Sequence, residues 1–368
     1  MQADSKQEVL VTHKAARQPR VSILLAVHDA RDVAARTVES ILNQEYRDLE
    51  LIVADCASRD YTATILQRYA ERDIRVELLR LDDADVAAGR DAALAAAHGT
   101  FALFMDQGDW LASGCLDSLV AAAEESSAQL AIPAFSIDST RSDGSRTSMV
   151  CAPASQVWGD ARSFRKDFGR LLADRLFLNT AGKLMRVSRL RDQHLRFSQA
   201  NGDFDLMASY LRHVERVCVV QGPCCHVSAS ATGWCRGTGP GPLSYKQVER
   251  DYERVLSLYR SWGLIDDAES MEEVHRLHLS EVIRCIGEVA VDSHSLSPIE
   301  RRRAVQGMID APSTRDSIEA LRPQARDFGI MFAPIARRSA AACCMGARIQ
   351  DIVERTLAPF TPARAACR

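Results

Sequence analysis

Three clusters of polar residues stand at the ends of apolar runs in the first third of this chain. They are His28-Asp29, Asp55-Cys56 and the tetrapeptide from Asp106 to Asp109. Carboxylate oxygens can hold a divalent cation, and a carboxylate in a partly buried position can take a proton from a reacting hydroxyl. These residue types therefore suit cation binding and general base catalysis, provided that the fold brings the clusters together.

The apolar runs that carry these clusters have the length of β-strands and alternate with helical patterns. Strands separated by helices form β-α-β units, in which helices cover both faces of a parallel sheet. Ligands of such sheets bind beyond the carboxyl ends of the strands, so we expect all three clusters on one rim. The predicted strands span 21–27, 49–55, 75–81 and 100–106, and the predicted helices span 30–44, 59–72 and 85–98.

The rest of the chain has a different pattern. Short strand signals and a helix near 161–175 occupy 128–235, and long helices are predicted at 243–261, 265–291, 297–309 and 314–326. A last helical pattern over 331–358 places apolar residues on one stripe, interrupted by Ser339, among several arginines. Such a helix can rest on an anionic membrane surface, but packing on its own domain is the favoured interpretation. The apolar positions are Ile335, Ala342, Met345, Ile349, Ile352 and Val353, and the arginines are Arg337, Arg338, Arg348 and Arg355.

The bulk composition disfavours several classes of protein. A net charge of -3 over 368 residues argues against a nucleic-acid partner, because affinity for phosphates depends on excess Lys and Arg. The first twenty residues lack the apolar core of a signal peptide, and no apolar stretch of about eighteen residues predicts a membrane span. We therefore expect a cytoplasmic protein, either free or at the inner face of the membrane. No G-x-G-x-x-G follows the first strand, which disfavours a Rossmann oxidoreductase.

Several segments in order resemble the family 2 glycosyltransferases, many of which build bacterial surface polysaccharides. VSILLAVHD (21–29), SILNQEYRDLELIVADCASRDYT (40–62) and ADVAAGRDAALAAAHGTFALFMDQGDWL (84–111) are similar to the family's nucleotide-binding motifs. NTAGKLMRVSRL (179–190) and LRFSQANGDFDLM (195–207) are similar to its downstream segments. The resemblance covers about residues 20–227. It implies a GT-A fold over 20–240, preceded by a polar extension (1–19) and followed by a helical region (241–368).

The resemblance also implies a site for the nucleotide of a sugar donor. Asp55 would accept a hydrogen bond from a uracil ring, with Val27 and His28 beside it and His28 in place of the family's aromatic residue. Arg90 matches the Arg of the family's ARN segment and would touch the nucleotide. Two alternatives stay open, because Asp55 could cap the turn before Ser58 and Arg90 could be an exposed helical arginine.

The remaining expectations concern the leaving group and the acceptor. Asp106 would bind the nucleotide and, with Asp109, would hold Mn²⁺ or Mg²⁺, although Gly108 stands where the family has the metal carboxylate. Asp109 could instead be a structural residue beside Trp110. Asp203 is the predicted general base, and a helix cap is its alternative role.

The chain departs from the family pattern at further positions. Gly202 replaces the Glu before the predicted base, and the neighbouring Asp205 could compensate. Cys56, Ala57 and Asp91 are departures in the nucleotide-binding motifs. The sequence therefore predicts an inverting transferase that moves a sugar from a nucleotide sugar, expected to be a UDP-sugar, to a glycan or lipid-linked acceptor. The alternative is a catalytically degenerate protein that serves as a binding partner in a polysaccharide assembly complex.

Overall fold

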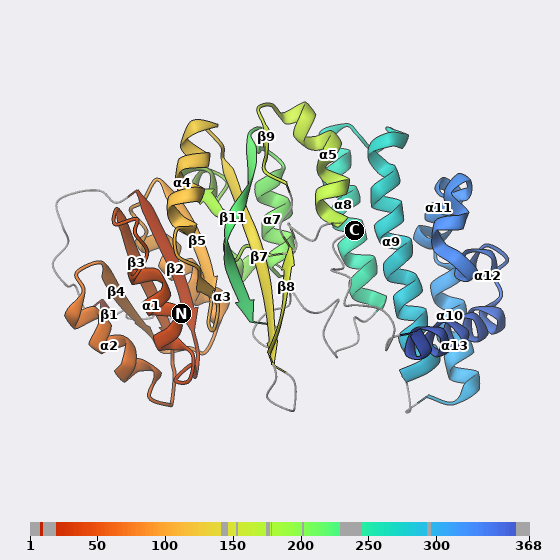
Figure 1. The fold of residues 1–368 in the computed structure, drawn as a ribbon, viewed down its shortest axis with the longest axis horizontal. Helices are drawn as coiled ribbons and strands as arrows, with labels where there is room; N and C mark the ends of the chain where they lie inside the picture. The colour runs from red at the N-terminus through yellow and green to blue at the C-terminus, as the bar shows by residue number, and fades with distance from the viewer. Residues whose placement is uncertain are drawn as a thin grey trace, which may run out of the picture. The chain divides into compact units, whose positions relative to one another are not determined.

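The computed structural model describes residues 8–9, 20–140, 146–151, 154–173, 177, 179–200, 202–228, 245–292 and 296–357. The chain divides into two compact units. The first unit comprises Met1–Phe164 and Leu176–Cys235, and the second comprises Arg165–Arg175 and Arg236–Arg368. In Figure 1 the first unit runs mainly from red to green and the second mainly from cyan to blue.

The first unit is built on one mixed sheet. Its strands are β1 (Glu8–Val9), β2 (Val21–Val27), β3 (Leu49–Cys56), β4 (Val76–Leu81), β5 (Phe101–Asp106), β6 (Trp110–Leu111), β7 (Leu130–Thr140), β8 (Arg146–Cys151), β9 (Gln156–Trp158), β10 (Leu184–Arg186) and β11 (Val217–Ser228). The order is β1-β4-β3-β2-β5-β10-β7-β11-β6, with β8 on β7 and β9 on β11. The four predicted strands β4, β3, β2 and β5 are parallel neighbours. Beyond β5 the pairing is mixed, because several short strands enter the sheet in the antiparallel direction.

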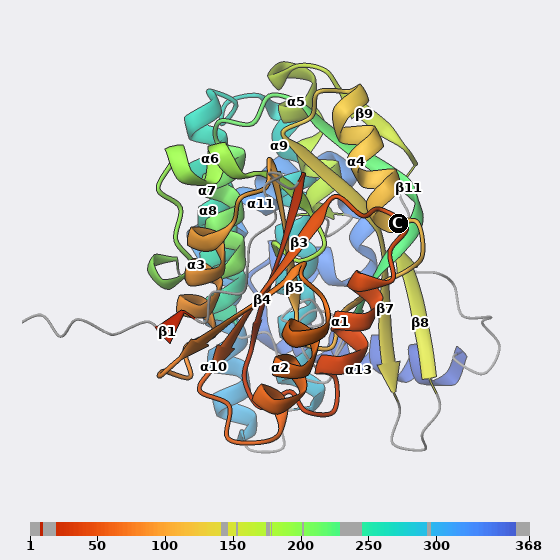
Figure 2. The same cartoon turned by 90° about the vertical axis from the view of Figure 1, so that its left-hand side faces the viewer.

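Helices cover both faces of this sheet, and the predicted α/β architecture is confirmed. The helices are α1 (Ala34–Leu42), α2 (Thr62–Arg72), α3 (Val86–Ala96), α4 (Cys115–Glu125), α5 (Ala161–Ala173, shared by the two units), α6 (Val187–Asp192) and α7 (Asp203–Leu211). Figure 2 shows α1 and α4 on one face and α3, α6 and α7 on the other. The crossover through α1 runs from β2 to β3, whereas that through α3 returns from β4 to β5. Right-handed crossovers in opposite directions place these two helices on opposite faces.

Helix α3 lies unusually close to the sheet because it carries a glycine. A Cβ built on Gly89 would lie 2.4 Å from Cys56 Sγ and 3.2 Å from Ala26 Cβ. Cys56 is fully buried at the end of β3. Burial raises the pKa of its thiol to about 11, so the thiol is neutral at physiological pH. Cys56 is therefore a packing residue matched to Gly89.

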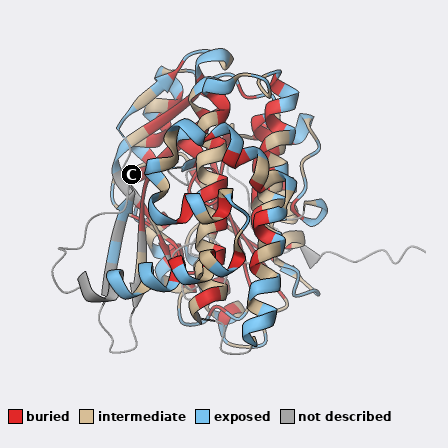
Figure 3. Cartoon of the chain, turned by 90° about the vertical axis from the view of Figure 1, so that its right-hand side faces the viewer, coloured by how far each residue is buried: buried red, intermediate tan, exposed pale blue. Residues whose placement is uncertain are grey.

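The second unit is helical. It contains α8 (Tyr245–Trp262), α9 (Ala268–Gly287) with a π-helical continuation (Glu288–Asp292), α10 (Pro298–Asp310), α11 (Pro312–Ala320), a 3₁₀ segment (Arg322–Met331), α12 (Phe332–Ala336) and α13 (Ala340–Leu357). Figure 3 colours these helices by burial, and buried residues alternate along them with exposed ones. The buried positions form one apolar core that includes Leu279, Val282, Ile309, Ile318 and Ile335. No helix among the described residues is both long and apolar enough to span a bilayer.

Two predicted helices of this unit are divided in the structure. The helix predicted at 314–326 ends as α11 at Ala320, and a 3₁₀ segment with Pro323 in its first turn follows. The pattern at 331–358 becomes α12 and α13, separated where Arg338 adopts a positive φ of 56°. Ser339 then caps the new helix, because its hydroxyl accepts the Ala342 N–H at 3.3 Å.

The contact between α3 and the sheet predicts a substitution with a rescue. Gly89→Ala should lower the free energy of unfolding by about 1–3 kcal/mol, because the new methyl group overlaps Cys56 Sγ. Adding Cys56→Ala removes the overlapping atom and should recover most of that loss in urea denaturation. Gly307→Ala in α10 is the matched control, since nothing lies within 4 Å of its new Cβ. Wild-type stability in Gly89→Ala alone would contradict this packing.

Candidate active site

The polar clusters lie together at one rim of the parallel strands. In the strand register, Val27 pairs with Asp55 across β2 and β3, and Ala26 pairs with Asp106 across β2 and β5. The residues that follow these strands therefore leave the sheet side by side, at the edge where ligands of parallel sheets bind. Val27 itself is fully buried in β2, so its side chain contributes to packing.

Hydrogen bonds connect the three loops of this rim. The backbone N–H of His28 donates to Gln107 Oε1 at 2.9 Å, and His28 Nδ1 lies 2.7 Å from the carbonyl oxygen of Cys56. Asp55 is almost fully buried, and its carboxylate accepts the Ser58 N–H at 3.3 Å. Asp55 thus makes the turn contact that the sequence left open. The contribution of Gln107 was not predicted, because it depends on where two loops meet.

Arg90 is the centre of the site. Its guanidinium donates to Asp203 Oδ1 at 2.7 Å and to Asp106 Oδ1. Only 13% of its side chain is exposed, so the alternative of an exposed helical arginine is wrong. Burial alone would lower the pKa of Arg90, but the two carboxylates more than offset that effect and raise it. Burial raises the pKa of Asp106 above its usual range, whereas Arg90 acts in the opposite direction.

An aromatic ring packs on Arg90, and Asp91 anchors the segment that carries this ring. The guanidinium carbon lies 5.1 Å from the ring centroid of Phe197, a cation–π contact. Asp91, the next residue of α3, accepts the backbone N–H groups of Phe197 at 2.7 Å and Ser198 at 3.1 Å. Asp91 stands where the resembling family has Asn, and here it anchors the segment that covers Arg90.

Asp203 begins α7 and has two partners. Its Oδ1 receives Arg90, and its Oδ2 accepts the Thr180 hydroxyl at 3.3 Å. Gly202 precedes it with a φ of 113°, a conformation that few residues other than glycine adopt. The Glu that the family carries at this position would be strained here. Thr180 was not predicted as a site residue, because only the folded chain brings it to Asp203.

A buried lysine lies behind the carboxylates. Lys183 is fully buried, and its Nζ donates to Asn179 Oδ1 at 2.8 Å and lies 4.8 Å from the ring centroid of Phe135. Burial lowers the pKa of Lys183 to about 7, although the charges of Asp203 and Asp106 act in the opposite direction. The sequence gives no sign of this, because a lysine is rarely fully buried.

The two predicted cation ligands, Asp106 and Asp109, share one turn but have different surroundings. Asp106 accepts a hydrogen bond from Arg90, whereas Asp109 is fully buried. Burial raises the pKa of the nearby Cys225, and the charge of Asp109 acts in the same direction. Gly108 donates its N–H to Thr37 Oγ1 at 3.1 Å and supplies no oxygen ligand from a side chain. Among the described residues, no three His, Cys, Asp or Glu side chains form a group that could hold a metal ion. Asp106 instead has the guanidinium of Arg90 beside it as a source of positive charge.

The chain was compared with known protein families and sequences. Residues 22–188 match the family Glycosyl transferase family 2. The Bacillus subtilis (strain 168) protein TuaG, named for teichuronic acid biosynthesis, is 30% identical over 148 residues, which are 39% of this chain and 57% of TuaG. The Escherichia coli enzyme WfaP, named as a UDP-Glc:alpha-D-GlcNAc-diphosphoundecaprenol beta-1,3-glucosyltransferase, is 35% identical over 91 residues, or 24% of this chain and 36% of WfaP. The chain thus spans a little over half of TuaG and about a third of WfaP.

The fold was compared with solved structures. The Staphylococcus aureus protein TarS (residues 1–349), solved in complex with UDP-GlcNAc, superposes with a TM-score of 0.63. The match covers 91% of this chain and 92% of that chain, at 13% sequence identity. At that identity the likeness concerns the fold, and it agrees with the expected GT-A architecture followed by a helical region.

The buried lysine predicts a pH dependence of stability. The pKa of Lys183 is lower in the folded chain than the usual value of about 10.4 in the unfolded chain. The free energy of unfolding is therefore highest above about pH 10.4, where Lys183 is neutral in both states. It decreases as the pH falls toward about 7, because only the unfolded chain binds the proton in this range. Relative to Lys183→Met, the wild type should gain about 2 kcal/mol in free energy of unfolding between about pH 7.5 and about pH 9.

Denaturation of both proteins at the two pH values measures this difference. Lys166→Met, at an exposed lysine, is the control and should differ from the wild type equally at both values. A constant gap between the wild type and Lys183→Met would contradict the burial of an uncharged amine.

Proposed function

We propose that this chain, whose residues 22–188 match Glycosyl transferase family 2, is an inverting glycosyltransferase. It moves a sugar from a nucleotide sugar to the hydroxyl group of an acceptor. The observation that carries the proposal is the bridge from Asp106 through Arg90 to Asp203, at the rim where ligands of parallel strands bind.

The proposed donor is a UDP-sugar. Asp55 and His28 receive the base at the ends of β3 and β2, beside the backbone of Val27, and Asp106 receives the ribose. The hydrogen bonds between these loops support this role, since they hold the polar groups in fixed positions before the donor arrives. The donors named with WfaP and with the TarS complex are also UDP-sugars.

Arg90 is the proposed partner of the leaving diphosphate. GT-A enzymes commonly use a divalent cation for this task, but here the expected ligand Asp106 is paired with Arg90. A guanidinium presents several N–H donors in a plane and suits phosphate oxygens. Its position between Asp106 and Asp203 places the charge between the proposed nucleotide and acceptor sides of the site.

Asp203 is the proposed general base of a single displacement. As the acceptor oxygen forms its bond to the anomeric carbon, the bond from that carbon to the diphosphate breaks, and its electron pair stays on the departing phosphate oxygen. The acceptor proton passes to Asp203, and attack from the opposite side inverts the anomeric configuration. Arg90 and Thr180 fix the orientation of the carboxylate.

The proposed acceptor is a glycan or a lipid-linked sugar in the synthesis of a surface polysaccharide. The names of TuaG and WfaP support this class, because one refers to teichuronic acid and the other to a diphosphoundecaprenol acceptor. A second candidate is a donor-binding protein without transferase activity that serves as a partner in an assembly complex. The absence of acids at Cys56, Gly108 and Gly202 favours that candidate.

One substitution separates the two candidates. Asp203→Asn should keep UDP binding but lower sugar transfer on the order of 10²–10⁴-fold, because the amide cannot take the acceptor proton. The assay follows nucleotide release and product formation with a panel of nucleotide sugars and polyprenyl-linked acceptors. Asp205→Asn, two residues along α7, is the matched control and should retain activity. If the wild type binds UDP but transfers no sugar to any acceptor, the second candidate replaces the first.

A further inference from the structure

Helix α13 has two apolar faces, and the second unit uses only one of them. Ala340, Cys343 and Ala347 are buried in the core of that unit, and the helix packs against α9, α10 and α12. The alternative of a helix packed on its own domain therefore describes one side of α13. On the other side, Met345 and Ile349 have exposed fractions of 63% and 47%.

The exposed residues form one continuous patch. Positions 345, 349, 352 and 353 follow the spacing of a single helical stripe, and Ile352 and Val353 are 62% and 48% exposed. Ile330 extends the stripe, because it is 54% exposed and its Cδ1 lies 4.0 Å from where a Cβ on Gly346 would be. We call these five residues the α13 patch: Ile330, Met345, Ile349, Ile352 and Val353. Singly exposed apolar residues are ordinary, but a cluster of this kind marks an interaction surface.

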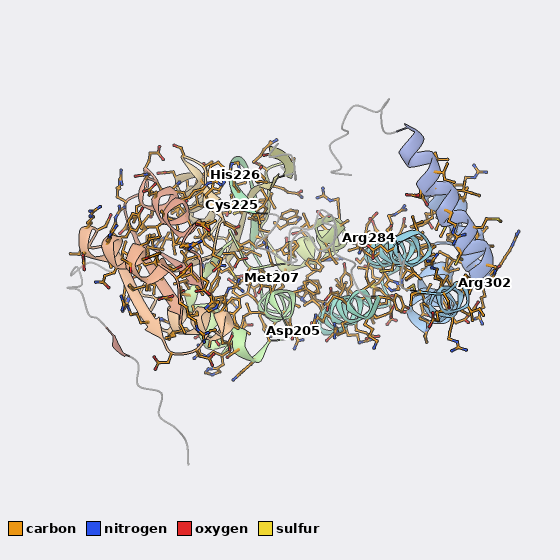
Figure 4. The ribbon with its side chains drawn as sticks, turned by 90° about the horizontal axis from the view of Figure 1, so that it is seen from below. Asp205, Met207, Cys225, His226, Arg284 and Arg302 are labelled. Atoms are coloured by element: carbon orange, nitrogen blue, oxygen red, sulfur yellow. The ribbon has the colours of Figure 1, made fainter. Side chains whose placement is uncertain are left out.

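The charge around the patch is opposite in sign to that of the whole chain. Residues 332–353 contain three arginines and one acidic residue, a net charge of +2, in a chain whose net charge is -3. Arg337, Arg338 and Arg348 of this segment are exposed. Arg302 adds a further exposed cation from α10, which packs on α13 (Figure 4). Exposed apolar side chains bordered by arginine are the composition of a helix that lies in a membrane interface.

We propose that the α13 patch docks this protein onto an anionic lipid surface, with the apolar residues among the acyl chains and the arginines at the headgroups. A second copy of the chain fits this surface less well. A symmetric dimer would bring the patch against itself and place two segments of net charge +2 together. A nucleic acid would pair with the arginines but leave the apolar residues in water. The proposal goes beyond sugar transfer, and its test needs neither donor nor acceptor.

The test uses the full chain and vesicles of defined composition. Co-sedimentation with vesicles of phosphatidylcholine containing about 30% phosphatidylglycerol should show binding that weakens as salt is raised, because screening reduces the attraction. Vesicles of phosphatidylcholine alone should bind at least tenfold more weakly, since each arginine near an anionic surface contributes about fivefold in affinity. Equal binding to both vesicles, or binding to neither, would overturn the proposal.

Two pairs of substitutions assign the binding to the patch. Met345→Glu combined with Ile349→Glu should reduce binding to the anionic vesicles more than tenfold. The control pair, Ile74→Glu with Ile299→Glu, changes the net charge equally at exposed isoleucines outside the patch and should retain most of the binding. Circular dichroism should show unchanged helix content in both, because all four side chains are exposed. Equal binding by the two variants would place the lipid contact elsewhere and contradict the proposal.

A third variant tests the contribution of the arginines to lipid binding, and a mass measurement tests whether a second copy of the chain binds the patch. Arg337→Gln combined with Arg348→Gln should lower affinity for the anionic vesicles by at least tenfold and leave the weak binding to phosphatidylcholine unchanged. Light scattering of the wild type without lipid should give the mass of a monomer. A dimer that dissociates only in the Met345→Glu and Ile349→Glu variant would show a second copy on the patch and overturn the lipid proposal.

Discussion

The bridge that Arg90 makes between Asp106 and Asp203 is the interaction on which the site depends. It joins the end of β5 to the start of α7, and the partners Arg90 and Asp203 are 113 residues apart in the sequence. A buried guanidinium with two carboxylates is stable only as a set, because removing one member leaves an uncompensated charge away from water. Phe197, anchored by Asp91, contacts the arginine, and Thr180 donates to Asp203. The nucleotide and acceptor sides of the proposed reaction are therefore connected through one side chain.

Several departures from the family pattern have a local structural explanation. Cys56 fits against Gly89, Asp91 anchors the segment over Arg90, and Gly202 adopts a conformation that would strain the usual Glu. Gly108 is different, because it has no side-chain oxygen at the position where the resembling family has a cation ligand. Under the proposed function, Arg90 supplies positive charge to the leaving diphosphate. These residues are consistent with a site organised around Arg90, which the resembling family also carries, and transfer activity is the property that separates the two candidate functions.

The sequence predicts the parallel strands well because they are continuous apolar runs buried on both sides. It predicts that Asp55 and Asp106 share a rim for the same reason, since strand order fixes where the chain leaves the sheet. It does not predict the burial of Arg90 or Lys183, because each depends on residues brought from other segments, such as Phe197 and Phe135. The sequence also does not predict the division between α12 and α13. In the sequence, Ser339 only interrupts an apolar stripe, whereas in the structure Arg338 has a positive φ and Ser339 caps a new helix. That new helix carries the exposed patch.

Calorimetric titration of UDP tests the central claim most directly, because the claim assigns the diphosphate to Arg90 in place of a cation. UDP is titrated into the wild type in the presence of Mn²⁺ and in the presence of a chelator, and then into Arg90→Gln. These titrations compare the cation with the arginine as the source of positive charge. Arg68→Gln, at an exposed position of α2, is the control. The account predicts the same affinity with Mn²⁺ and with chelator, a loss of at least tenfold in Arg90→Gln, and no change in Arg68→Gln. Binding that requires Mn²⁺ and survives in Arg90→Gln would contradict it.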